Sequence, residues 1–211
     1  MRRLDHLGVP MVNDHVRLLR ELRAVRRFTS DPVPQHLLDD LLEVARWTGS
    51  RGNRQPWEVI LVRTRKTLET LGAVAGAKGL RHLAGAAAAF VLVPCGPLTE
   101  FDAGRWTERV MLAAAAHGLG SSVAWFPENQ ASAAMAVLGV PSDRPVRTAI
   151  SVGYPADDSA HLVSVERDVD HRLPLAAMEI GRKPLAEILH VERYGQRMPD
   201  QPTDGRPTHH G

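Results

Sequence analysis

A regular alternation of short apolar segments with longer segments of helical spacing constrains the fold of this chain most strongly. Four apolar segments are typical of buried strands, at Trp57–Val62, Ala88–Val93, Ser121–Phe126 and Val146–Val152. Between them, apolar residues recur with helical spacing at Thr67–Ala75, Asp102–His117 and Ala131–Leu138. Strands that alternate with helices predict crossover connections, and therefore a mixed, largely parallel sheet covered by helices.

The chain continues on both sides of this alternating region. Helical spacing predicts two helices before the first strand, around Val16–Leu22 and Leu37–Ala45, and Pro34 suits the entry of the second. After Pro155 the pattern weakens, and a short helical element is predicted near Pro184–His190. The sequence shows no internal repeat and no interdomain linker. We therefore expect a single domain over residues 1–195 and a disordered tail over 196–211.

Composition argues against several classes of protein. The 211 residues include 26 basic and 24 acidic ones, and a net charge of +2 without a run of five like charges argues against nucleic-acid binding. The longest apolar stretch, Leu83–Pro94, is far shorter than the roughly 20 residues of a membrane-spanning helix, so no membrane partner is expected. Asp5, His6 and Asp14 interrupt the region where a secretory signal needs an apolar run, which predicts a cytoplasmic protein.

Most signatures of protein-based catalysis are missing from the sequence. It has no HExxH, CxxC or GxSxG motif and no Walker glycine loop, and its histidines lack ligand spacing, so no metal site is predicted. The single cysteine, Cys95, excludes an internal disulfide. Cys95 also lacks the partner pattern of a nucleophile, so we predict a structural role for it.

Two polar segments are stronger candidates for a binding site. Arg23–Phe28 (RAVRRF) places three arginines beside a loop, and Ser50–Trp57 (SRGNRQPW) places two amides before a predicted strand. Taken separately, the first segment is also typical of a solvated helix end, where the helix dipole attracts cations. The second is also typical of a polar connection before a core tryptophan. Neither segment alone identifies a function.

In register, the two segments resemble the FMN-dependent nitroreductase family. The resemblance covers about residues 18–195 and continues with the segments DAGRWTERVMLAAAAHGLGSS, AISVGYP and GRKPLAEILH. It implies an α+β fold, a three-layer α/β/α sandwich whose central mixed sheet is flanked by helices and followed by a C-terminal extension. It also implies a homodimer with each flavin at the subunit interface.

Carried over by position, the resemblance assigns one group of residues to the FMN phosphate. Arg23 and Arg182 are implied to hold it, with the backbone around Ala24 assisting. Forked guanidinium groups from two chain segments suit a phosphate dianion. Many relatives carry Arg-Arg-Ser where this chain has Leu22, Arg23 and Ala24, which removes two phosphate contacts.

A second group is implied to contact the flavin ring. Arg26 falls where the family places a basic residue, and a cation there stabilises negative charge that develops on reduction. Asn53, and less strongly Gln55, fall at an amide position that both donates and accepts hydrogen bonds. The segment 124–129 (AWFPEN) is implied to line the other side of the flavin, where the choice of substrate is expected to reside.

The resemblance implies a small-molecule oxidoreductase. NADH or NADPH is the expected hydride donor, FMN the cofactor, and nitroaromatics, quinones or other electron-poor molecules the acceptors, in a ping-pong reaction. Because the cofactor performs the chemistry, no catalytic side chain is predicted. The alternative is a non-catalytic store or sensor of flavin with the same fold. A third hypothesis, nucleic-acid binding through the arginines, has only the high isoelectric point in its favour.

Overall fold

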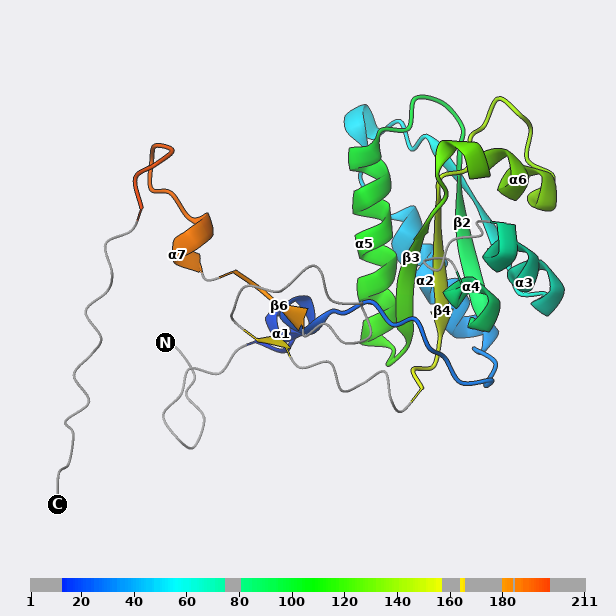
Figure 1. Cartoon of the computed structure of the whole chain (residues 1–211), viewed down its shortest axis with the longest axis horizontal. Helices are drawn as coiled ribbons and strands as arrows, with labels where there is room; N and C mark the ends of the chain where they lie inside the picture. Colours follow the sequence, from blue (N-terminus) through cyan, green and yellow to red (C-terminus); the bar gives the residue numbers. More distant parts are fainter. Residues whose placement is uncertain (1–12, 75–80, 157–163, 166–179, 184, 198–211) are drawn as a thin grey trace, which may run out of the picture. The chain divides into compact units, whose positions relative to one another are not determined.

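The computed structural model describes residues 13–74, 81–156, 164–165, 180–183 and 185–197 (Figure 1). The chain divides into two compact units, residues 1–160 and 161–211, and each is described by itself. Most of the predicted tail, residues 198–211, lies outside the described residues.

The first unit is built on a four-stranded sheet with the order β1-β2-β4-β3. Its strands are β1 (Trp57–Val62), β2 (Ala88–Pro94), β3 (Gly120–Trp125) and β4 (Thr148–Gly153). All three pairings are antiparallel, so the expectation of a largely parallel strand order is wrong for this sheet. The reason is that two helical connections, from β1 to β2 and from β3 to β4, return to the end of the sheet from which they left. Only the connection from β2 to β3 crosses the sheet and leaves its two strands parallel, with β4 between them.

Helices cover both faces of the sheet, as Figure 1 shows. These are α2 (Gln35–Arg46) and α5 (Glu100–Ala116) on one face and α3 (Arg65–Val74), α4 (His82–Gly85) and α6 (Glu128–Leu138) on the other. The first unit also contains the helix α1 (Asp14–Glu21) and a 3-10 turn, η1 (Arg51–Asn53), before β1. These elements confirm the predicted α+β class with helices on both sides of a central sheet. The short α4 and the turn η1 were not predicted.

Two hydrophobic cores lie on the two faces of the sheet. Because side chains alternate along a strand, Phe90 and Ile150 face α2 and α5, whereas Val91 and Ala149 face α3, α4 and α6. The first core is centred on Trp106 of α5, whose side chain is completely buried. Every residue of β2 except its last is buried, which explains why its sequence reads as a continuous apolar run.

Helix α1 is amphipathic, as predicted, but it has no buried residue. Val16 and Leu19, which lie on its apolar stripe, are 46% and 57% exposed. Among the described residues, no helix is long and apolar enough to cross a membrane.

The register of the strands defines two ends of the sheet. Trp57, Pro94, Trp125 and Thr148 lie together at one end, here called the Trp57 end. At the opposite end β3 begins and β4 stops, with Gly120 paired to Gly153, and we call it the Gly120 end. Helix α5 begins near the Trp57 end, because its cap residue Thr99 follows closely after β2.

The second unit contains a short parallel pair of strands, β5 (Ser164–Val165) and β6 (Ile180–Gly181), and the helix α7 (Leu185–Ile188). Helix α7 confirms the short helical element predicted near its position. The Arg197 guanidinium donates to the Glu187 carbonyl at 2.5 Å, and the rings of His190 and Tyr194 stack at 4.4 Å.

Candidate functional site

The arginine segment, residues 23–28, is fastened to the Gly120 end of the sheet. The Val25 amide donates to the Ser121 carbonyl at 2.8 Å, and the Thr29 amide donates to the Tyr154 carbonyl at 2.9 Å. An isolated antiparallel bridge joins Phe28 to Pro155. The segment is therefore held by backbone hydrogen bonds to the start of β3 and to the residues that follow β4.

Two glycines permit this close approach. A Cβ atom on Gly120 would lie 2.6 Å from Cγ1 of Val25, and one on Gly153 would lie 3.0 Å from Cδ1 of Phe28. Real Cβ atoms essentially never approach another heavy atom to less than 3.0 Å. The strand ends carry glycine because the arginine segment occupies the space of a side chain.

The predicted phosphate-binding and ring-binding residues of this segment differ in their surroundings. Arg23 is half-buried, and its Nη1 donates to the carbonyls of Arg20 at 2.8 Å and Leu22 at 2.7 Å. Ala24 is half-buried beside it. Arg26 is exposed, and its side chain makes no hydrogen bond or ion pair within the described part of the chain. Arg23 is thus anchored to its own backbone, whereas Arg26 presents its guanidinium to solvent.

The two predicted amides lie in an exposed turn before β1, which we call the amide turn (residues 51–55). Gly52, Asn53 and Gln55 have φ angles of 60°, 54° and 49°, in the left-handed region that residues other than glycine rarely adopt. The Gln55 side-chain amide donates to the Asn53 carbonyl at 3.3 Å and to Asn53 Oδ1 at 3.4 Å. Asn53 and Gln55 are therefore brought together, with their amides at the surface.

A buried carboxylate holds the amide turn in place. Asp102, in the first turn of α5, is 1% exposed, and its Oδ1 accepts from the Arg51 amide at 3.2 Å. Its Oδ2 accepts from the Thr99 hydroxyl at 2.9 Å. The Thr99 hydroxyl in turn accepts from the Asp102 amide and caps the helix. Sequence reasoning missed Asp102, although its place in the first turn of a helix is a recognisable capping signal.

We expect Asp102→Ala to destabilise the first unit by about 2–4 kcal/mol, because the substitution leaves the Arg51 amide and the Thr99 hydroxyl without their acceptor. Urea denaturation measures the loss, and hydrogen exchange should show faster exchange of the Arg51 amide. Glu100→Gln is the matched control, since Glu100 is an exposed acid in the same helical turn, and its effect should stay within about 0.5 kcal/mol. Equal stability of the Asp102 variant and the wild type would contradict this role.

The arginine segment and the amide turn lie at opposite ends of the sheet. The segment contacts β3 and β4 at the Gly120 end, whereas Gln55 leads directly into β1 at the Trp57 end. A strand of six residues is about 17 Å long, so one subunit does not bring the two groups together. Arg182 is exposed and belongs to the second unit.

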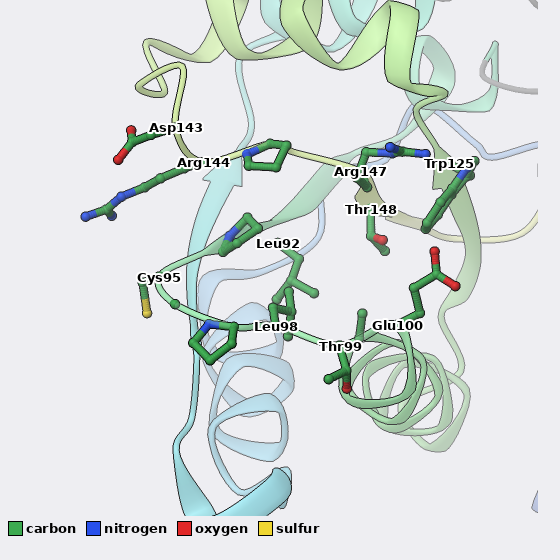
Figure 2. A pocket seen from close by; sticks show the side chains of 15 residues that line it. Leu92, Cys95, Leu98, Thr99, Glu100, Trp125, Asp143, Arg144, Arg147 and Thr148 are labelled. Carbon is green, nitrogen blue, oxygen red and sulfur yellow. The ribbon is translucent and has the colours of Figure 1, made fainter.

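A pocket of about 610 Å³ opens at the Trp57 end, between the ends of β2 and β3, the start of β4 and the start of α5 (Figure 2). Trp125, from the segment predicted to line the flavin, lines this pocket. Arg147, which precedes β4, and Thr148, the first residue of β4, line it as well. Cys95 is exposed and also lines this pocket, and its structural role stays a prediction. The chain turns outward at Gly96, just after β2, which explains this exposure.

Comparison with known proteins finds relatives of one family. The family model described as "Nitroreductase family" matches residues 19–92, which include the arginine segment and the amide turn. An Archaeoglobus fulgidus protein named "Putative NADH dehydrogenase/NAD(P)H nitroreductase" is 29% identical over 154 residues, covering 68% of this chain and 86% of that protein. These matches support the nitroreductase family that the sequence resembles. A chloronitrobenzene nitroreductase of Comamonas testosteroni is 36% identical over 77 residues, covering 34% of this chain and 33% of that protein.

Solved nitroreductase structures share the fold. An FMN-dependent nitroreductase from Clostridium difficile superimposes with a TM-score of 0.63 at 25% identity, covering 67% of this chain and 88% of that one. A nitroreductase from Desulfovibrio desulfuricans, solved in complex with FMN, gives a TM-score of 0.68 at 23% identity, covering 87% and 99% of the two chains. The three-layer nitroreductase fold predicted from the sequence is thereby confirmed.

Proposed function

We infer that this protein is an FMN-dependent oxidoreductase that uses NADH or NADPH to reduce electron-poor small molecules such as nitroaromatics or quinones in a ping-pong reaction. The observation that carries this proposal is the arginine segment, which is held against the sheet inside the region that matches the family model. The described residues contain no group of three or more histidine, cysteine, aspartate or glutamate side chains placed to hold a metal. The pyridine nucleotide donors are cytoplasmic metabolites, which supports the cytoplasm as the site of the reaction.

The exposed residues of both segments fit FMN chemically. Within the described residues, the side chain of Arg26 makes no hydrogen bond and that of Asn53 makes only the 3.4 Å contact with Gln55. A free guanidinium and a free amide suit the polar edge of a flavin ring, which carries both donors and acceptors. When bound, FMN supplies the ring that takes hydride from the donor and passes electrons to the acceptor.

Each proposed residue has a binding or orienting role in this reaction. Arg23 and Arg182 bind the phosphate through charge-assisted hydrogen bonds, and the backbone at Ala24 assists. Arg26 stabilises negative charge at the ring, and Asn53 and Gln55 fix the ring's orientation. No proton-transfer or nucleophilic side chain is needed.

A homodimer with composite sites supplies both segments to one flavin. The arginine segment and the amide turn of one chain lie at opposite ends of its sheet, so a second copy is needed to place an amide turn next to an arginine segment. Surfaces that a second copy would cover are present on the first unit. The outer face of α5, from Phe101 to Arg109, carries a hollow of about 570 Å³, and Phe101 is 74% exposed. The uncovered apolar stripe of α1 is another such surface.

The visible absorption spectrum of the purified protein, recorded without air before and after addition of NADH or NADPH, tests the proposal. We expect a flavin band that bleaches with at least one donor and returns on addition of a quinone or nitroaromatic acceptor. A flavin band that no donor bleaches would support the non-catalytic store or sensor. A colourless protein that also fails to take up added FMN would show that Leu22 and Ala24, which replace phosphate contacts of many relatives, abolish the site.

A further inference from the structure

The pocket at the Trp57 end contains none of the arginines and amides proposed to bind FMN, and it shares only Trp125 with the segment implied to line the other side of the flavin. Its lining is somewhat more apolar than polar, and the apolar part includes Leu92, Leu98, Ala103, Pro94, Pro97 and Pro145. Trp125 forms one side, and Figure 2 shows its ring turned toward the interior. A volume of about 610 Å³ with a mixed, partly apolar lining is typical of a site for a small organic molecule.

Arg147 is the distinctive polar group of this pocket. Its guanidinium carbon lies 4.9 Å from the centre of the Trp125 ring, in a cation–π contact. Its Nε is buried and has no hydrogen-bond acceptor, and the side chain forms no ion pair within the part of the chain that the structure describes. Arg147 as a whole is half-buried, and its charge is not compensated by an ion pair within the described residues, so the rest of its guanidinium is available to pair with an anion.

The second arginine of the lining differs from the first. Nη1 of Arg144 donates to Glu58 Oε2 at 2.7 Å in an ion pair on the surface. Because this charge is already compensated, Arg144 contributes less than Arg147 to the attraction of an anion.

The acidic residues of the lining limit the charge of the ligand. Glu100 and Asp143 are exposed, so water hydrates both carboxylates at little cost. They would repel a second negative charge on a bound molecule. A ligand with one anionic group at the Arg147 end and an uncharged body therefore fits the lining best.

We propose that this pocket binds a planar aromatic monocarboxylate, whose carboxylate pairs with Arg147 and whose ring lies against Trp125 and the apolar wall. The fork of the guanidinium matches the two oxygens of a carboxylate, and the cation–π contact keeps the guanidinium beside Trp125. The proposal does not rest on the proposed function, because every contact it uses comes from this pocket's own lining in the first unit.

Calorimetric titration of the full-length protein with 2-naphthoate tests this site. We expect 2-naphthoate to bind at least about tenfold more tightly than the uncharged 2-naphthamide, because only the carboxylate forms charge-assisted hydrogen bonds with Arg147. The doubly charged 2,6-naphthalenedicarboxylate should bind more weakly than 2-naphthoate, because its second charge meets Glu100 and Asp143.

Matched arginine variants locate the bound carboxylate. Arg147→Met keeps an apolar side chain of similar length beside Trp125 and should weaken naphthoate binding at least about tenfold while leaving naphthamide unchanged. Arg144→Met should change naphthoate binding by less than about threefold, since the charge of Arg144 is already paired. Circular dichroism verifies that both variants are folded.

Three results would overturn the proposal: equal affinity for naphthoate and naphthamide, tight binding of inorganic phosphate in place of the carboxylate, or an equal loss in both arginine variants. None of these results bears on the flavin, because the titration is read without a donor or an acceptor. A protein that binds 2-naphthoate but shows no flavin band that NADH or NADPH bleaches would confirm this site and contradict the proposed function.

Discussion

Co-expression of an Arg26→Ala chain with an Asn53→Gly chain should restore the wild-type FMN affinity that neither variant has alone. If each flavin site takes Arg26 from one chain and Asn53 from the other, one site of this heterodimer contains both substitutions. The other site then contains neither. We therefore expect each single variant to lose about tenfold or more in FMN affinity, and the purified heterodimer to bind FMN with wild-type affinity at about half of its sites. Glycine at position 53 preserves the left-handed backbone, whose φ is 54° in the wild type.

Two differently tagged chains allow the heterodimer to be purified, and fluorescence titration with FMN counts its high-affinity sites. If Arg26 and Asn53 of one chain served the same flavin, every site of the heterodimer would contain one change, and no wild-type site would appear. A doubly altered chain co-expressed with the wild type is the matched control. Under the composite arrangement each site of that heterodimer carries one change, so it should contain no site of wild-type affinity.

Gly120→Ala should detach the arginine segment from the sheet. The new Cβ would lie 2.6 Å from Cγ1 and 2.7 Å from Cβ of Val25, and the backbone of Val25 is tied to Ser121. We expect a loss of about 1–3 kcal/mol in the free energy of unfolding, together with a loss of FMN retention of at least about tenfold. Thermal unfolding and dialysis followed by absorption spectroscopy measure the two effects.

Gly85→Ala is the matched control, since no atom lies within 4 Å of the position that its Cβ would occupy. This substitution should be neutral or stabilise by about 0.4–1 kcal/mol, through the unfolded chain. The double variant Val25→Gly/Gly120→Ala should be less destabilised than the sum of its single variants, because the overlapping atoms are gone. Additive effects in this cycle would show that Gly120 and Val25 do not compete for space.

Local sequence patterns predicted the elements of this fold well. The apolar run Trp57–Val62 coincides with β1, and the alanine-rich helix predicted over Asp102–His117 differs from α5 by two residues at its start and one at its end. Helix α6 starts three residues earlier than predicted, because Pro127 is its N-cap and Glu128 lies in the first turn. The four-residue helix α4 is too short to show periodicity, and it was missed.

Features that depend on distant residues could not be predicted in this way. The antiparallel order of the sheet depends on where each helical connection returns, which local periodicity does not encode. The pocket combines residues from three separate stretches of the chain, 92–103, 125 and 143–148, and only Cys95 and Trp125 among its lining residues were discussed from the sequence. The resemblance to nitroreductases drew attention to the arginine segment and the amide turn, but their separation by the length of the sheet became visible only in the folded chain.

The backbone bonds of the arginine segment determine when the proposed flavin site can form during protein synthesis. The amides of Val25 and Thr29 donate to the carbonyls of Ser121 and Tyr154. These hydrogen bonds can therefore form only after the later part of the first unit has been synthesised. Closing such long loops is slow relative to forming local helices. A ribosome must therefore release β4 before the segment can dock. Chains truncated before Tyr154 lack part of this anchor, which restricts flavin loading to nearly complete first units.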